Sequence, residues 1–163
     1  MKILGVDPGL RVTGYGVIAM IPKKGSFSRM DLIEAGIVRT HEREGIAERL
    51  RKIYGALSDV VKEFKPDVLA IEKLYAHYKH PATSILMGHA RGVVCLVAGE
   101  QGIPLMNIAS THIKKALTSH GHAGKMQMQR MVQRQLGLKE IPEPPDVADA
   151  LAVAIACASQ KRI

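Results

Sequence analysis

The stretch Ile3-Leu4-Gly5-Val6-Asp7-Pro8-Gly9, close to the start of the 163-residue chain, decides the fold. A short, mostly apolar run that ends in turn residues is typical of a strand buried on both faces of a sheet. Asp7 therefore stands where a central strand ends, which is where open α/β sheets build their sites. An Asp here also commonly initiates a Pro-Gly turn, so this stretch alone does not separate chemistry from local structure.

The rest of the chain alternates between strand and helix patterns. We expect further strands at residues 12–18, 31–40, 67–72 and 103–108. We expect helices at residues 43–64, 82–99, 110–117, 125–136 and 145–159. The helix at 43–64 has the clearest pattern, because its apolar residues recur every three or four positions. Three hairpin-connected strands followed by alternating helices and strands predict an α/β fold with a mixed five-stranded sheet, in a single domain over residues 1–163.

The charge balance points to a polyanionic partner. The chain has 23 Lys and Arg against 15 Asp and Glu, a formal net charge of +8. Such an excess in a small domain favours nucleic acid as the partner. Simple solubility would explain the same excess, so charge alone does not exclude it.

Hydropathy and cysteine usage indicate where the protein works. The chain has no run of 18 or more apolar residues, so we expect no membrane span. Its start lacks the basic region and long apolar core of a signal peptide. Cys95 and Cys157 lie in apolar, helix-like stretches and are expected to be buried thiols in a reducing compartment, the cytoplasm.

Three further acids stand in settings that resemble that of Asp7. Glu72 also ends a buried strand, although it would equally suit a surface pair with Lys73. Asp146 and Asp149 share one face of the last predicted helix. Asp146 also suits the helix start after two prolines. Asp149 lies within a helix that is apolar all round, where a buried carboxylate needs a cation or a hydrogen-bond network.

These four acids can converge on one rim of the molecule. Unpaired carboxylates packed together repel one another, and divalent metal ions relieve that repulsion. An oxygen-only ligand set favours Mg²⁺ or Mn²⁺ over Zn²⁺. Two such ions can activate a water and stabilise the leaving oxygen in phosphodiester hydrolysis. A basic protein built around an acidic metal site therefore fits a nuclease.

The sequence resembles the RuvC family of bacterial Holliday-junction resolvases. The resemblance rests on segments that occur in the family order and span nearly the whole chain. These segments are Gly5-Val6-Asp7-Pro8-Gly9, Thr13-Gly14-Tyr15-Gly16, Ala70-Ile71-Glu72, Ala90-Arg91-Gly92 and Asp146-Val147-Ala148-Asp149-Ala150-Leu151-Ala152.

The resemblance implies a ribonuclease-H-like fold, a homodimer, and Mg²⁺-dependent symmetric nicking of four-way DNA junctions in recombination and repair. It also implies a branch-migration motor complex as a partner. Its metal-binding catalytic acids would be Asp7, Glu72, Asp146 and Asp149.

The same resemblance implies several DNA contacts. Lys114 and Lys125 match family lysines near the bound DNA, and we expect Lys125 to act beside the scissile phosphate. Tyr75 falls where the family has an aromatic residue that stacks on junction bases, and any base offers a face to a tyrosine ring. The basic residues that we expect to follow phosphates are Lys79, Arg91, Lys114, Lys115, Lys125, Arg130 and Arg134.

The chain departs from the family pattern at two places. Tyr78-Lys79-His80-Pro81 stands where the family usually has a Lys-Asn pair, and His89 replaces a common Gln. These departures concern the preferred cleavage sequence and the junction contacts more than the chemistry.

Three other function classes deserve comparison. The hairpin around Asp7 also resembles the first phosphate loop of actin-like ATPases and sugar kinases, which need a second lobe that this chain is too short to hold. A non-catalytic nucleic-acid-binding module would be favoured by the loss of one acid, but all four are present. A ribonuclease-H-like nuclease that acts on RNA is the closest rival.

Overall fold

The computed structural model describes residues 1–22, 29–73, 81–118 and 123–160. In this part of the chain the strands are β1 (Lys2–Asp7), β2 (Val12–Ile21), β3 (Arg29–Arg39), β4 (Val68–Glu72) and β5 (Leu105–Ile108). The helices are α1 (Ile46–Phe64), α2 (Pro81–Glu100), α3 (Ser110–Thr118), α4 (Lys125–Leu136) and α5 (Pro145–Gln160). Strand and helix alternate as the sequence predicted.

The strands form one mixed sheet in the order β3-β2-β1-β4-β5. The first three strands are an antiparallel meander, in which β2 pairs with both β1 and β3. β4 is parallel to β1, and β5 is parallel to β4. The prediction of a mixed five-stranded sheet is therefore confirmed, and the two central strands β1 and β4 end at the same edge.

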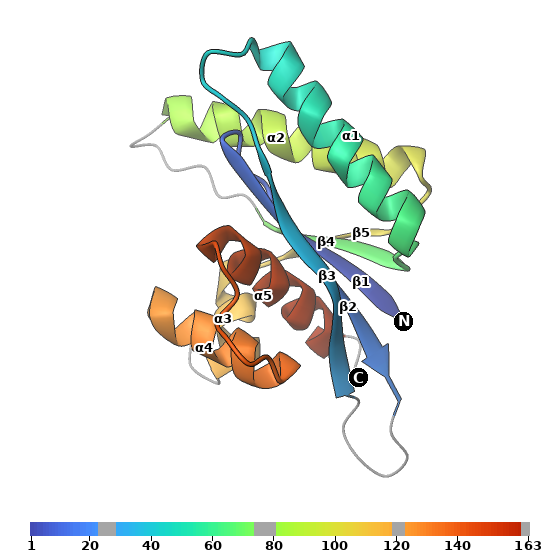
Figure 1. Cartoon of the computed structure of the whole chain (residues 1–163), viewed down its shortest axis with the longest axis vertical. Coiled ribbons are helices and arrows are strands. Elements are labelled where there is room, and N and C mark those ends of the chain that lie inside the picture. Colours follow the sequence, from blue (N-terminus) through green and yellow to red (C-terminus); the bar gives the residue numbers. More distant parts are fainter. Residues whose placement is uncertain (23–28, 74–80, 119–122, 161–163) are drawn as a thin grey trace.

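Helices cover both faces of the sheet (Figure 1). α1 and α2 lie on one face, and α5 lies on the other with α3 and α4 outside it. The side chains of the central strands alternate between these layers, as a period of two requires. Ile3 belongs to the core beneath α5, whereas Leu4 and Val6 belong to the core beneath α1 and α2. β1 is thus buried on both faces, as its apolar sequence predicted.

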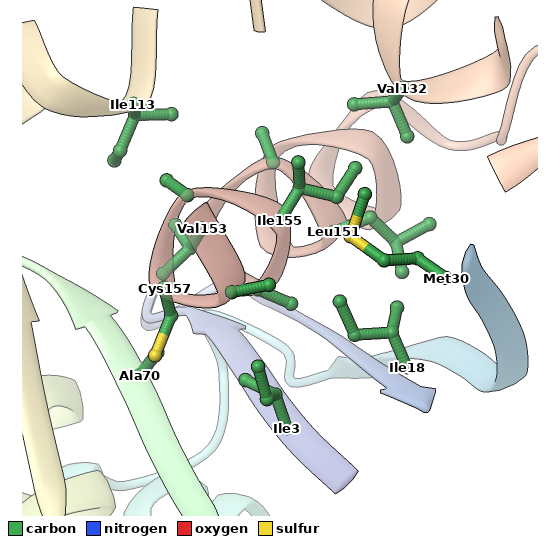
Figure 2. Close-up of a cluster of buried hydrophobic side chains, with 14 of the residues drawn as sticks. Ile3, Ile18, Met30, Ala70, Ile113, Val132, Leu151, Val153, Ile155 and Cys157 are labelled. Atoms are coloured by element: carbon green, nitrogen blue, oxygen red, sulfur yellow. The ribbon is translucent and has the colours of Figure 1, made fainter. Parts of the chain in front are cut away.

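The position of α5 explains why this helix is apolar on every side. Figure 2 shows Leu151 and Ile155 of α5 lying between residues of the sheet, such as Ile18, and residues of the outer helices, such as Val132. Every residue of α5 from Val147 to Ala158 except Asp149 is buried. A carboxylate on such a helix stands out, because the rest of the helix is core.

Several boundaries differ from the predictions for physical reasons. The β2–β3 hairpin runs further than residues 18 and 31, because Met20 pairs with Met30, whose side chain is buried. α1 begins at Ile46 rather than at residue 43, after an extended Gly45. The three residues before that glycine are held in a turn by Glu44, whose carboxylate accepts a hydrogen bond from the backbone N–H of His41. In the described part of the chain, no helix has the length and apolar character to cross a membrane.

Candidate active site

Two of the predicted acids meet because their strands are parallel. Val6 of β1 lies beside Ile71 of β4, and Asp7 and Glu72 are the next residues of the two strands. Both carboxylates line a pocket of about 310 Å³, together with Asp149 of α5. The carboxyl edge of the sheet therefore holds the acids on rigid strands, as the sequence predicted.

Glycines let α5 approach this edge closely enough to bring its acids to the strands. Asp7 pairs with Gly14 of β2. A Cβ at Gly14 would lie 2.1 Å from the backbone oxygen of Asp146, and one at Gly5 would lie 2.2 Å from that of Ala150. Any side chain at these positions would push α5 away from the sheet. Gly5 and Gly14 therefore set the height of Asp146 and Asp149 above Asp7.

The electrostatics of Asp7 show that the other three acids lie close enough to act on it. Burial, the largest cause, and repulsion by neighbouring acids together raise the pKa of the Asp7 carboxyl from its usual 3.8 to about 7. The repulsion comes, in decreasing order, from Asp149, Asp146 and Glu72. The positive charge of Lys125 opposes this shift. The site therefore disfavours its own negative charge and would gain from a cation among the acids.

Lysines stand beside the acids in the same pocket. Lys125 Nζ lies 3.3 Å from Asp149 Oδ2, and the lysine side chain is largely open to solvent while that of Asp149 is partly exposed, so this pair contributes little to stability. Lys114 of α3 lines the pocket as well. Lys125 is the first residue of α4, after an extended Gly124 that has no side chain to cap the helix. The first-turn N–H groups of α4 are therefore open to an anion beside the acids.

The donor set suits a hard divalent cation that keeps part of its water shell. Within the described residues, no three His, Cys, Asp or Glu side chains come close enough to form a complete metal cage on their own. Mg²⁺ seldom needs one, since it usually binds one or two carboxylates and fills its remaining positions with water and substrate phosphate. The pocket offers carboxylate oxygens whose negative charges repel one another, so its residues fit Mg²⁺ or Mn²⁺.

The other predicted DNA contacts lie in several places. Lys115 of α3 and Arg130 and Arg134 of α4 are exposed. Arg91 of α2 is partly buried and donates hydrogen bonds to the backbone oxygen of Glu72 and to Asn107 Oδ1. The predictions for Tyr75 and Lys79 lie outside the described residues.

Two residues near the acids were not singled out from the sequence. Ser110, the first residue of α3, lines the pocket. Asn107 is exposed on β5 and accepts the hydrogen bond from Arg91. Asn is uncommon in strands, so its presence in a short apolar strand was a signal that could have drawn attention to it.

The sequence matches a family of nucleases over nearly its whole length. The family model described as crossover junction endodeoxyribonuclease RuvC matches residues 3–157. The RuvC crossover junction endodeoxyribonuclease of Rhodopirellula baltica is 46% identical over 153 residues, which cover 94% of this chain and 83% of that protein. The corresponding protein of Desulforamulus reducens is 43% identical over 155 residues, covering 95% of this chain and 91% of its own.

Solved structures agree with these matches. The structure of Thermus thermophilus RuvC superposes with a TM-score of 0.90 at 34% identity, covering 99% of this chain and 96% of its own. The complex of the same protein with a Holliday junction substrate gives a TM-score of 0.88 at 34% identity, covering 99% of this chain and 95% of the T. thermophilus chain. The fold is therefore ribonuclease-H-like, and the chain belongs to the RuvC family of crossover junction endodeoxyribonucleases.

Proposed function

We propose that this protein is a metal-dependent endonuclease that resolves four-way DNA junctions by paired symmetric nicks during recombination and repair. The observation that carries the proposal is the pocket in which Asp7, Glu72 and Asp149 meet beside two lysines, Lys114 and Lys125. Its family membership supports the choice of substrate, because the T. thermophilus relative was solved in complex with a Holliday junction substrate.

The four acids would hold the metal ions. Asp7 and Glu72 offer carboxylates from rigid strand ends, and Asp146 and Asp149 offer theirs from the first two turns of α5. Two Mg²⁺ ions, or Mn²⁺ in their place, would supply water activation and stabilisation of the leaving oxygen. The chain itself holds the acids at fixed heights through the close approach of α5 to β1 and β2.

Basic groups would hold the DNA backbone against these acids. Lys125 and Lys114 stand in the acid pocket, so each can contact a phosphate beside the reacting one. Lys125 would act in the chemistry as well, by offsetting negative charge at the scissile phosphate. Exposed Lys115 and Arg130 would contact phosphates further away. We propose the same for Lys79, and base stacking for Tyr75.

Paired nicks at a symmetric junction require two sites, so the working form would be a homodimer. A branch-migration motor is proposed as a further partner on the family resemblance. Cys95 and Cys157 are free thiols, which suits work in the cytoplasm.

A nuclease that acts on RNA is the nearest alternative, because the same acids would serve it. One assay separates the two: wild-type protein with Mg²⁺ is given a labelled four-way junction, the matched DNA duplex, single-stranded RNA and an RNA–DNA hybrid in parallel. We expect paired cuts in the junction alone. Cutting of RNA with an intact junction would overturn the proposal, and so would full cutting in excess EDTA.

A further inference from the structure

Arg91 joins the ends of two strands beside the acid pocket. Its Nη1 donates a hydrogen bond to the backbone oxygen of Glu72, the last residue of β4. Its Nη2 donates to the side-chain oxygen of Asn107 on β5. One guanidinium group therefore links α2 to the ends of both strands on one side of the site.

The sheet itself holds Glu72 from one side. β5 pairs with β4 through Glu72 and Ile108, and the backbone N–H of Lys73 donates to the oxygen of Ile108 at 2.8 Å. The pairing with β1 stops one residue earlier, at Ile71. Beyond Asp7 on that side comes Pro8, which has no backbone N–H to donate. Arg91 supplies a donor where the ladder of strand hydrogen bonds runs out.

The backbone carbonyl that Arg91 binds belongs to Glu72, one of the four acids of the site. A rotation of the peptide unit after Glu72 would turn the Cα of Glu72 and move its carboxylate within the pocket. We propose that Arg91 is a positioning residue, whose forked guanidinium fixes the end of β4 and so directs the Glu72 carboxylate toward Asp7 and Asp149. This inference rests on the proposed function of the acid pocket.

A role as a positioning residue differs from the phosphate contact that the sequence predicted for Arg91. A phosphate contact depends on positive charge, which a lysine keeps. Loss of such a contact weakens DNA binding and lowers the salt dependence of binding by about one unit of slope. Positioning depends on the planar fork, because two acceptors on different strands must be bound at once, and lysine lacks that fork.

The test compares Arg91→Lys, Arg91→Gln and Asn107→Ala with wild type. Arg51→Gln is the matched control, since Arg51 is exposed on α1, away from the pocket. Each protein is assayed for junction Kd in EDTA over a range of salt, for single-turnover cleavage with Mg²⁺, and for the rise in Tm that Mg²⁺ causes.

We expect both Arg91 variants to cut about 10- to 100-fold more slowly, which is the usual cost of removing a group that orients a metal ligand. Asn107→Ala should show a smaller loss in the same direction. Junction Kd and its salt slope should stay those of wild type, and the Mg²⁺-induced rise in Tm should shrink. Arg51→Gln should match wild type in cleavage.

Several results would overturn the inference. If Arg91→Lys cuts like wild type while Arg91→Gln binds more weakly with a flatter salt slope, Arg91 is a phosphate contact. If Asn107→Ala and Arg91→Lys both cut at the rate of wild type, the positioning role of Arg91 is also contradicted, even if Arg91→Gln fails to fold. A wild-type protein that leaves the junction uncut contradicts the proposed function instead, and the Mg²⁺-induced change in Tm then still tests the positioning role.

Discussion

The two faces of the sheet are packed in different ways. The face under α5 also has large buried side chains, but at two glycines backbone meets backbone: a Cβ at Gly5 or Gly14 would lie within 2.2 Å of a main-chain oxygen of α5. On the face under α1 and α2, large side chains such as Ile53 and Leu57 fill the space, and both are fully buried. The helix that carries two of the acids is thus the one that sits closest to the sheet.

The two faces therefore differ in whether a loss of packing also moves the acids. Side-chain packing beneath α1 can lose volume without moving the acids, because α1 contributes none of them. Backbone packing beneath α5 cannot change without altering the height of Asp146 and Asp149 above the strand ends. We therefore expect substitutions on the α1 face to reduce stability alone, and substitutions on the α5 face to reduce cleavage as well.

The largest expected effect on stability comes from Leu57→Ala on the α1 face. Loss of a fully buried leucine leaves a cavity, and such substitutions cost about 2–5 kcal/mol. Chemical denaturation measures the change in the free energy of unfolding. Single-turnover cleavage by the folded fraction should stay within about twofold of wild type, a small effect on the scale of 1.4 kcal/mol per tenfold. A folded Leu57→Ala protein that no longer cuts would break the distinction between the faces.

Asp7→Asn should raise the stability of the metal-free protein at high pH. Because the pKa of the Asp7 carboxyl is raised to about 7 in the folded state, the folded protein keeps the carboxyl proton to higher pH than the unfolded chain does. Wild type therefore loses stability as the pH rises from about 4 through about 7, and the asparagine variant avoids that loss. The full shift would correspond to about 4 kcal/mol at pH 8.

The measurement is urea denaturation of both proteins in EDTA between pH 4 and pH 8. The difference between them should grow with pH, and added Mg²⁺ should stabilise wild type more than the variant at pH 8. If the difference in the free energy of unfolding between the two proteins stays constant with pH, Asp7 is not the acid whose pKa is raised in the site.

Gly14→Ala tests the close approach of α5. The added methyl group would overlap the backbone oxygen of Asp146, so the helix must move. Overpacking of this kind costs about 1–3 kcal/mol. Unlike Leu57→Ala, this variant should also lose most of its cleavage while it still binds the junction. Normal cleavage by a folded Gly14→Ala protein would show that the height of α5 does not set the geometry of the acids.

The smallest effect, with the opposite sign, is expected for Gly55→Ala. Gly55 lies within α1, and a Cβ there would meet no atom within 4 Å. Alanine in place of glycine inside a helix should stabilise the protein by about 0.5–1 kcal/mol. It serves as the matched glycine control for Gly14, and a rise in Tm with unchanged cleavage is the expected result. A fall in Tm would mean that the α1 face is as tightly constrained as the α5 face.

The local patterns of the sequence predicted the strand that carries Asp7 and the buried helix that carries Asp149. Both are dense apolar segments whose period or uniformity reveals their burial. The start of α1 was placed too early, because the turn before Gly45 depends on the hydrogen bond between Glu44 and His41 rather than on apolar spacing.

The individual hydrogen bonds between distant segments could not be predicted from the sequence. Arg91 was predicted as a phosphate contact, yet its hydrogen bonds go to β4 and β5, which reach it only through the packing of α2 on the sheet. Gly9 was noticed only as a turn residue. Gly9 has an ordinary negative φ, and the need for glycine there comes from the oxygen of Val12, which would lie 2.3 Å from a Cβ.

We propose that four carboxylates at one edge of the sheet form a metal-dependent site that cuts four-way junctions. Glu72→Gln tests it most directly, because the amide keeps the shape of the side chain and removes its charge. The measurement is single-turnover cleavage of a labelled junction in Mg²⁺, with junction Kd measured in parallel. We expect unchanged binding and no cleavage above background. Cleavage by Glu72→Gln at a rate near that of wild type would contradict it.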